Sequence, residues 1–256
     1  MTEQNRQVSR EKAEMIYGLH SVIEALEAGK EFDKVFIRNG LHNERSRDLL
    51  NILRNRNIPY QFVPQEKLQK ITRKNHQGVI GMGSLIEYGS LEVIVPGLFE
   101  QGKTPFILAL DGITDVRNMG ALARTAECAG VDAMLIPIKG MAQINADAIK
   151  TSSGALHNLT VCRTENLAMS LDFLKNSGLR LIAASEKGEA EYSSAVLTGP
   201  IVLVIGSEEK GVSGSVLGVV DEEIRIPILG KTKSLNASVA GGIIMYEVLR
   251  QRDQTK

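Results

Sequence analysis

The pattern of hydrophobic and polar positions changes part-way along the chain, and its two parts predict different structures. Residues 15–86 alternate short apolar strands with amphipathic helices, as expected of a small α/β layer. The helices of this part are predicted at Ser21–Ala28, Asn43–Asn55 and Gln65–Ile71, and the strands at Lys34–Arg38, Tyr60–Val63 and Val79–Met82.

From Pro105 onward, nearly continuous apolar strands alternate with helices. That pattern is typical of a parallel sheet covered by helices on both faces, so the predicted fold class is α/β. The strands are predicted at Phe106–Leu110, Ala133–Ile138, Leu159–Arg163, Arg180–Ala184, Ile201–Ile205 and Glu223–Ile228. The helices are predicted at Asn118–Ala129, Ala146–Leu156, Leu167–Asn176, Ser213–Val220 and Asn236–Arg252.

These patterns divide the chain into four segments. We expect a disordered leader at 1–12, a small α/β domain at 13–86, a linker at 87–104 and a larger domain at 105–256. The linker is predicted because this stretch mixes glycine, proline and apolar residues without a clear period, although it could hold a helical turn.

Composition excludes several classes of protein. The chain has 256 residues, of which 43% are hydrophobic, but apolar runs such as Ile201–Ile205 are far too short to span a bilayer. The N-terminus has no apolar core like that of a signal peptide, so we expect a cytoplasmic protein. The two cysteines, Cys128 and Cys162, and the four unclustered histidines give neither a disulfide framework nor metal-ligand spacing, and no metal site is predicted.

Charge is neutral overall but unevenly distributed. Residues 1–86 hold 14 Lys and Arg against 10 Asp and Glu, whereas the rest of the chain holds 16 against 20. The basic surplus in the first part suggests a polyanionic partner, although a surplus of four charges also suits an ordinary solvated face. Aromatic residues are only 4% of the chain, which disfavours base stacking on a wide aromatic platform.

Three glycine-flanked loops, each after a predicted strand, carry the candidate chemistry. They are Leu110–Gly120, Ile205–Ser213 and Ile226–Ser238, and no dinucleotide-binding GxGxxG, P-loop or nucleophile-elbow motif accompanies them. Open α/β folds bind ligands at the carboxyl edge of the sheet, so the loops are expected to converge on one site. Each also has a simpler interpretation, since Glu208 suits a surface turn, Arg124 a solvated helix face, and Ser234 and Asn236 helix caps.

The last predicted helix contains Gly241 and Gly242 in its interior. Each glycine costs roughly 1 kcal/mol of helix stability relative to alanine. Such a cost suggests that the helix backbone closely approaches a ligand, a threaded loop or a second subunit.

In order and spacing, the three loops resemble those of the SpoU (SPOUT-class) RNA ribose 2′-O-methyltransferases. The matching blocks are Asp111–Ala126, Gly206–Ser213 and Ile226–Ala240. Residues 16–26 and His76–Val79 are similar to the small RNA-binding domain of the subfamily that methylates a guanosine of 23S rRNA. The resemblance implies an α/β sheet with a C-terminal trefoil knot, a homodimer with its active site at the subunit interface, and S-adenosylmethionine as methyl donor.

Site residues are carried over by position. The resemblance implies a cofactor pocket lined by Gly206, Ile226 and Leu235. It implies catalytic roles for five polar residues, namely Arg124, Asn118, Glu208, Ser234 and Asn236. Arg124 would stabilise the developing ribose oxyanion, and the other four would position Arg124, the ribose or the nucleotide.

Selection of the RNA position is expected of residues 1–86, with Arg73, Lys74 and His76 as candidate contacts, although a solvated loop suits them too. The sequence leaves three alternatives: the same chemistry on tRNA, a non-catalytic RNA-binding or ribosome-assembly protein, and a sheet that binds another nucleoside cofactor.

Overall fold

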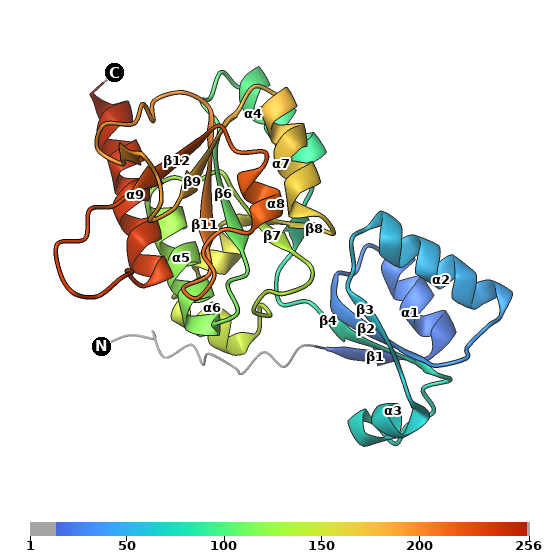
Figure 1. Ribbon diagram of the computed structural model, residues 1–256. Helices are drawn as coiled ribbons and strands as arrows, with labels where there is room; N and C mark the ends of the chain where they lie inside the picture. The colour runs from blue at the N-terminus through green and yellow to red at the C-terminus, as the bar shows by residue number, and fades with distance from the viewer. Residues whose placement is uncertain (1–13, 255–256) are drawn as a thin grey trace, which may run out of the picture. The chain divides into compact units, whose positions relative to one another are not determined.

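A computed structural model describes residues 14–254, and the expected leader at 1–12 lies outside them. The chain forms two compact units, a smaller one up to Ile86 and a larger one comprising Glu87–Gln143 and the chain from Asp147 onward (Figure 1). Within the described part of the chain, no helix combines the length and the apolar composition needed to cross a membrane.

The smaller unit contains a four-stranded mixed sheet with the strand order β1-β4-β2-β3. Strand β4 is antiparallel to β1 and β2, whereas β2 and β3 are parallel. Its elements are β1 (Met15–Tyr17), α1 (Leu19–Glu27), β2 (Phe32–Arg38), α2 (Glu44–Asn55), β3 (Tyr60–Val63), α3 (Gln65–Ile71) and β4 (Val79–Gly83).

Helices cover the two faces of this sheet unequally. Leu26 of α1 and Leu49 of α2 are fully buried in one cluster with Val35 and other strand residues. The opposite face has a smaller cluster, in which Leu68 of the seven-residue helix α3 packs with strand residues. The loop that follows α3 therefore lies on the less covered side of the sheet.

The larger unit contains an eight-stranded sheet in the order β10-β12-β9-β11-β6-β7-β8-β5, and every pairing is parallel. The strands are β5 (Tyr88–Gly89), β6 (Phe106–Asp111), β7 (Ala133–Pro137), β8 (Thr160–Thr164), β9 (Arg180–Ala184), β10 (Ala190–Glu191), β11 (Ile201–Gly206) and β12 (Glu222–Arg225). The helices are α4 (Leu91–Glu100), α5 (Val116–Cys128), α6 (Ala146–Thr151), the 3₁₀ turn η1 (Ala155–His157), α7 (Leu167–Asn176), α8 (Gly214–Leu217) and α9 (Ala237–Asp253).

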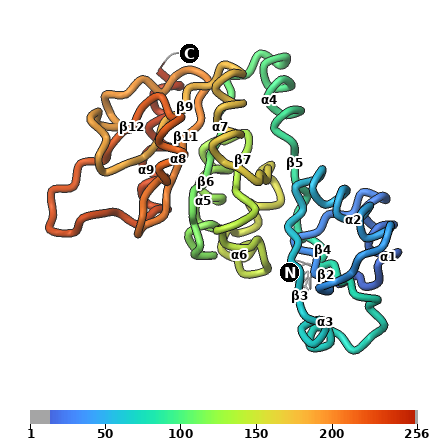
Figure 2. The backbone as a smooth tube through the Cα atoms, turned by 45° about the vertical axis from the view of Figure 1, so that its right-hand side comes forward, coloured from blue at the N-terminus to red at the C-terminus, as the bar shows by residue number. Residues whose placement is uncertain are grey.

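Helices lie on both faces of the larger sheet, as predicted (Figures 1 and 2). Helices α4, α7 and α8 share one buried cluster with sheet residues, while α5 and α9 contact each other on the opposite face. The α/β class and the parallel sheet are thereby confirmed. The trefoil knot stays a prediction from the resemblance.

The prediction of a linker at 87–104 was wrong. This segment contributes strand β5, which pairs with β8, and helix α4. Leu91, Val95 and Leu98 lie on one side of α4 and are buried, so their burial outweighs the helix-breaking tendency of Pro96. The proline and glycines of this segment mask the apolar stripe in the sequence.

Among the element boundaries that differ from the predictions, two have a clear local cause. The helix expected over Ala146–Leu156 ends at Thr151, because Ser153 and Gly154 have φ values of 53° and 86°, outside the right-handed helical region. The last strand, expected to reach Ile228, ends at Arg225, two residues before Pro227. Proline has no N–H to donate to a sheet ladder, which is consistent with the early end.

The glycine pair in α9 has a cause within the chain. A Cβ atom on Gly241 would lie 2.5 Å from Leu122 Cδ2, so this glycine allows α9 to pack closely on α5. Gly242 makes only ordinary contact with Thr125. Gly241 therefore does mark a close approach, but its partner is the neighbouring helix α5, which was not among the partners predicted.

Candidate active site

The two central strands of the larger sheet deliver two of the candidate loops to one place. Strands β6 and β11 are adjacent and parallel, with Leu110 opposite Ile205 and Asp111 opposite Gly206. The loops that leave them therefore start side by side at the carboxyl edge of the sheet. Asp111 Oδ2 ties them together by accepting a 2.7 Å hydrogen bond from the backbone N–H of Ser213.

Three side chains, one from each candidate loop, meet at this edge. Glu208 Oε1 accepts a 2.8 Å hydrogen bond from Asn118 Nδ2 and another from Asn236 Nδ2. Asn236 Nδ2 also donates to Asn118 Oδ1 at 2.9 Å. The three residues thus form a closed hydrogen-bonded triangle, although 90 residues separate Asn118 from Glu208.

Local structure holds each corner of the triangle. Asp115 caps α5, since its Oδ1 accepts from the N–H groups of Arg117 at 2.7 Å and Asn118 at 3.1 Å. Asn236 caps α9 in the same way, with Oδ1 accepting from Ser238 N at 3.0 Å. Asn236 therefore fulfils both roles considered from the sequence, because its oxygen caps the helix while its amino group joins the triangle.

Glu208 is held by a tight turn after β11. Ser207 and Gly211 exchange two backbone hydrogen bonds, of 3.1 Å and 2.9 Å, on either side of it. The turn folds back so closely that a Cβ atom on Gly206 would lie 2.2 Å from the carbonyl carbon of Gly211. Only glycine fits at position 206, and this close return aims Glu208 at Asn118 and Asn236.

The structure does not join Arg124 or Ser234 to the triangle. Arg124 lies six residues beyond Asn118 on α5, about 9 Å further along the helix axis. Its side chain is exposed and forms no hydrogen bond or ion pair within residues 14–254. Ser234 lies in the exposed loop before α9, two residues from Asn236. Both side chains are free to meet a substrate.

The three residues expected to line a cofactor pocket lie around the triangle. Gly206 is two residues before Glu208, Leu235 directly precedes Asn236, and Ile226 follows β12 at the same edge of the sheet. The loop between β12 and α9 exposes apolar side chains, among them Leu229 at 99% and Leu235 at 36%. Exposed apolar side chains therefore lie at this edge beside the polar triangle.

Two structural residues of the site were missed by sequence reasoning. Asp111 links two loops and Asp115 caps α5, yet neither was singled out. Both were visible as carboxylates directly after a buried strand and directly before a helix, which are the usual signals of such roles. Among residues 14–254 no cluster of His, Cys, Asp and Glu is suited to a metal ion.

Comparison with known proteins identifies the family of this chain. The model of the SpoU rRNA Methylase family matches residues 105–246, which include all three corners of the triangle. The chain belongs to the SpoU rRNA methylase family. A second model, described as RNA 2′-O ribose methyltransferase substrate binding, matches residues 15–88, the smaller unit.

Individual SpoU relatives agree with this assignment. A Staphylococcus haemolyticus protein provisionally named a TrmH family tRNA/rRNA methyltransferase is 33% identical over 240 residues, covering 94% of this chain and 96% of its own. A solved RNA 2′-O ribose methyltransferase is similar at 27% identity and a TM-score of 0.55, covering 93% of this chain and 88% of its own. The SpoU methyltransferase AviRb from Streptomyces viridochromogenes, solved with AdoMet, shares the fold at 22% identity and a TM-score of 0.60, covering 94% and 90%.

Proposed function

We propose that this RNA methyltransferase transfers the methyl group of S-adenosylmethionine to the ribose 2′-oxygen of a guanosine in 23S rRNA. The observation that carries the proposal is the triangle of Asn118, Glu208 and Asn236, which gathers the three family loops at the ligand-binding edge of the sheet. A SpoU relative solved with AdoMet and another described as an RNA 2′-O ribose methyltransferase support the choice of donor and acceptor.

The residues at the sheet edge fit the proposed donor. An adenosyl group needs apolar walls and backbone hydrogen-bonding groups more than it needs side-chain charge. Ile226 and Leu235 would provide apolar walls, and the backbone at Gly206 would provide hydrogen-bonding groups. S-adenosylmethionine, when bound, supplies a methyl group activated by a positively charged sulfur.

Arg124 is proposed as the catalytic residue. A ribose hydroxyl is a weak nucleophile at neutral pH, so its oxygen must be stabilised as negative charge develops. The Arg124 guanidinium is solvent-exposed and unpaired within the described chain, so its donors are available to that oxygen. Because a guanidinium stays protonated, it stabilises charge rather than accepting the proton, which leaves to water or phosphate.

The remaining residues are proposed to position the reactants. Asn118 and Glu208 would orient the ribose and the Arg124 side chain, while Ser234 and Asn236 would orient the nucleotide or the loop. The triangle prepares this arrangement before substrate binds, since its hydrogen bonds already hold three loops together. Such preorganisation lowers the reorganisation needed during reaction.

We also propose that the enzyme works as a homodimer. Helix α9 exposes Val239 at 49% and Tyr246 at 51%, seven residues apart on one side of the helix. Leu229 in the preceding loop is almost fully exposed. A second copy of the chain would bury these side chains next to the site and bring a partner residue near Arg124. Light scattering of the purified protein tests this, and a monomer at micromolar concentration would refute it.

The proposal is tested by replacing Arg124 with alanine and measuring two properties separately. Calorimetric titration with S-adenosylmethionine should be unchanged, whereas methyl transfer to RNA should fall by at least about 100-fold, as for loss of one oxyanion donor. Lys103→Ala, which removes an exposed cation from the turn before β6, serves as the matched control. An Arg124→Ala enzyme with normal methyl transfer would exclude the assigned role.

A cellular experiment tests the proposed substrate. Cells lacking the protein should lose one 2′-O-methylguanosine from 23S rRNA, as mapped by nucleoside mass spectrometry. We propose that the reaction takes place in the cytoplasm. The second candidate is tRNA, because the name of the staphylococcal relative covers both substrates. Loss of the modification from tRNA alone would select this alternative.

A further inference from the structure

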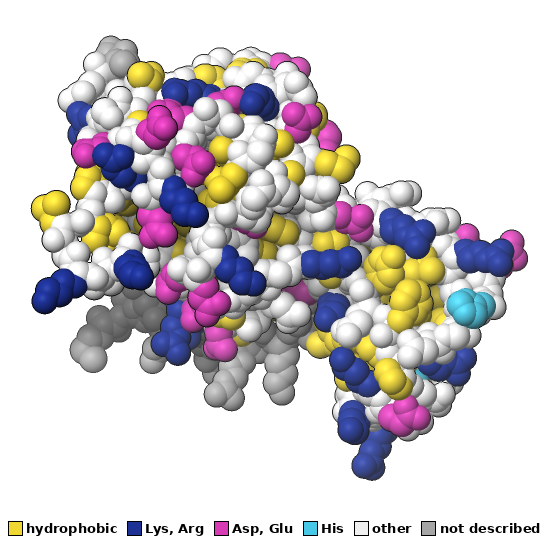
Figure 3. All heavy atoms as spheres, viewed as in Figure 1, with side chains coloured by type: hydrophobic (Ala, Val, Ile, Leu, Met, Phe, Trp, Pro, Cys, Tyr) yellow, Lys and Arg dark blue, Asp and Glu magenta, His cyan; other side chains and the backbone are white. Residues whose placement is uncertain are grey.

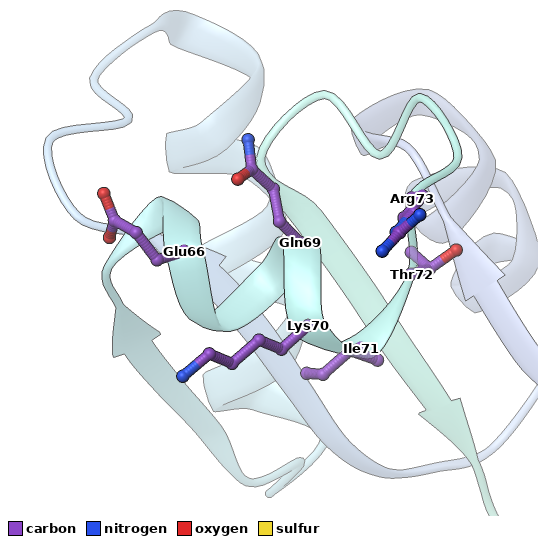
Figure 4. A pocket seen from close by; sticks show the side chains of 6 residues that line it. All are labelled: Glu66, Gln69, Lys70, Ile71, Thr72 and Arg73. Atoms are coloured by element: carbon purple, nitrogen blue, oxygen red, sulfur yellow. The ribbon is translucent and has the colours of Figure 1, made fainter.

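The smaller unit contains two adjoining hollows beside α3 and the loop that follows it. The narrower one has a volume of about 430 Å³ and is bounded by the end of β2, helix α3 and residues 72–78. The wider one, of about 800 Å³, shares Gln69, Thr72 and Arg73 with it (Figure 4). Among the six lining residues labelled in Figure 4, Glu66 lies on one side of the view and Arg73 on the other.

The lining of the narrower hollow has a marked chemical bias. Arg38, Arg73 and Lys74 contribute positive charge, and no Asp or Glu lines this hollow. Its volume lies within the range of ordinary small-molecule sites and is sufficient for one nucleotide. In Figure 3, Lys and Arg side chains gather around the α3 end of this unit, as expected of a surface that meets a polyanion.

Four carboxamide side chains accompany these cations. They belong to Gln65, Gln69, Asn75 and Gln77, and the Oε1 atom of Gln65 lies 3.5 Å from Arg38 Nη1. A carboxamide carries both a donor and an acceptor, which is what the edge of a nucleobase requires. A purely phosphate-binding surface would need only the cations.

His76 shows that the hollow is a built site rather than a gap between side chains. The residue is only 9% exposed, and its Nδ1 accepts a 3.0 Å hydrogen bond from the N–H of Gly78. Because Nδ1 accepts, the ring proton lies on Nε2. Within residues 14–254 this Nε2–H has no hydrogen-bond acceptor, and the residue lines the hollow, so the donor is available to a ligand.

The framework of the hollow is anchored to the sheet. Arg38 N donates to Gly78 O at 2.7 Å and Val79 N donates to His76 O at 2.9 Å, which ties the loop to β2 and β4. Lys74 lies over the ring of Tyr17 in β1, with Nζ 5.3 Å from the ring centroid. The backbone of the loop is therefore held in place before any ligand arrives.

We propose that this hollow binds one unpaired nucleotide of the substrate RNA. Arg38, Arg73 and Lys74 would contact the phosphates on either side, while the carboxamides and His76 Nε2–H would contact the base. This inference rests on the proposed function, because it assigns the part of the substrate RNA that the smaller unit holds. A base within a duplex stays stacked and cannot enter, so the ligand is single-stranded.

The first test locates the contact without any mutation. The full-length protein is photo-crosslinked to 23S rRNA transcribed with 4-thiouridine, and the crosslinked peptides are identified by mass spectrometry. Crosslinks within residues 65–78 are expected. Crosslinks of the smaller unit confined to α2, on the opposite side of its sheet, would overturn the proposal.

The second test removes two of the cations. The double variant Arg73→Gln/Lys74→Gln is compared with Arg47→Gln/Arg54→Gln, which removes two exposed charges from α2. Binding to a labelled 12-nucleotide single strand is measured at several salt concentrations. The slope of log affinity against log salt concentration should decrease in magnitude by about 1.4 in the Arg73/Lys74 variant, since each single-strand phosphate contact contributes about 0.7. That decrease corresponds to roughly 25-fold weaker binding at 0.1 M salt if the affinities converge at 1 M. Equal weakening in the control variant would overturn the proposal.

Two further controls separate this inference from the proposed function. Polyglutamate should displace the labelled strand poorly. If it displaced the strand as effectively as unlabelled RNA does, the hollow would be a general anion-binding surface and not a nucleotide site. Wild-type and variant proteins should bind S-adenosylmethionine equally. Failure of the wild-type protein to bind it would count against the proposed function, while the crosslink positions would still decide the nucleotide site.

Discussion

Replacing Gly206 with alanine should disable the site by moving the turn that carries Glu208. The new Cβ atom would lie 2.2 Å from Gly211 C, 2.3 Å from Val212 N and 2.4 Å from Gly211 O, whereas ordinary contact begins at 3.4 Å. All three neighbours are backbone atoms, so no side-chain rotation relieves the overlap. The turn must therefore shift by about 1 Å.

A shift of this size breaks the triangle. The hydrogen bond from Asn118 Nδ2 to Glu208 Oε1 measures 2.8 Å, and adding about 1 Å takes it beyond hydrogen-bonding distance. A misplacement of about 1 Å in a catalytic arrangement typically costs about 100-fold in rate. Overpacking against backbone should in addition destabilise the protein by about 1–3 kcal/mol.

The assay is transfer of a tritiated methyl group from S-adenosylmethionine to 23S rRNA, together with thermal unfolding of the same preparation. Gly214→Ala is the matched control, because a Cβ atom there meets nothing within 4 Å. We expect the control to keep both activity and stability. A Gly206→Ala protein with normal activity and an unchanged melting temperature would refute the link between this glycine, the turn and the triangle.

Two further predictions concern titratable groups outside the site. Burial raises the pKa of the Cys162 thiol to about 12. A thiol reagent at pH 8 should therefore label the exposed Cys128 quickly and Cys162 only on unfolding. Rapid labelling of both cysteines in the folded protein would contradict this. Hydrogen bonds from Arg250 and then Gln251 hold the pKa of Glu247 below its usual 4.5, despite the opposing effect of burial. Its stabilisation is thus present above about pH 4.5 and is lost as pH falls through the folded pKa. The melting temperature of the wild type should therefore exceed that of Glu247→Gln at pH 7 and approach it as the pH falls through the folded pKa, whereas a constant difference would contradict this.

Local signals explain why much of the fold was predictable. The bounds of α3, α7 and β9 agree with the sequence predictions, since an apolar period and a clear start or stop residue mark each of them. Asn166, for example, precedes α7 and caps it by accepting from Met169 N at 3.2 Å. The errors arose where local signals conflicted, as at Pro96 within α4.

The membership of the site was partly predictable as well. Sequence patterns alone pointed to three loops, and the resemblance named Asn118, Glu208 and Asn236 among the catalytic candidates. The structure brings these three together and leaves Arg124 and Ser234 outside the triangle.

The sequence by itself determined the alternation of strands and helices and the residues at strand ends, because these depend on neighbours a few positions away. The adjacency of β6 and β11, the return of the chain beside Gly206 and the contact of Gly241 with Leu122 were decided only by tertiary structure. These features join residues about 90 or more positions apart, or require a fit between specific backbone atoms. No local preference encodes them, because they arise from the strand order and close packing of the whole sheet.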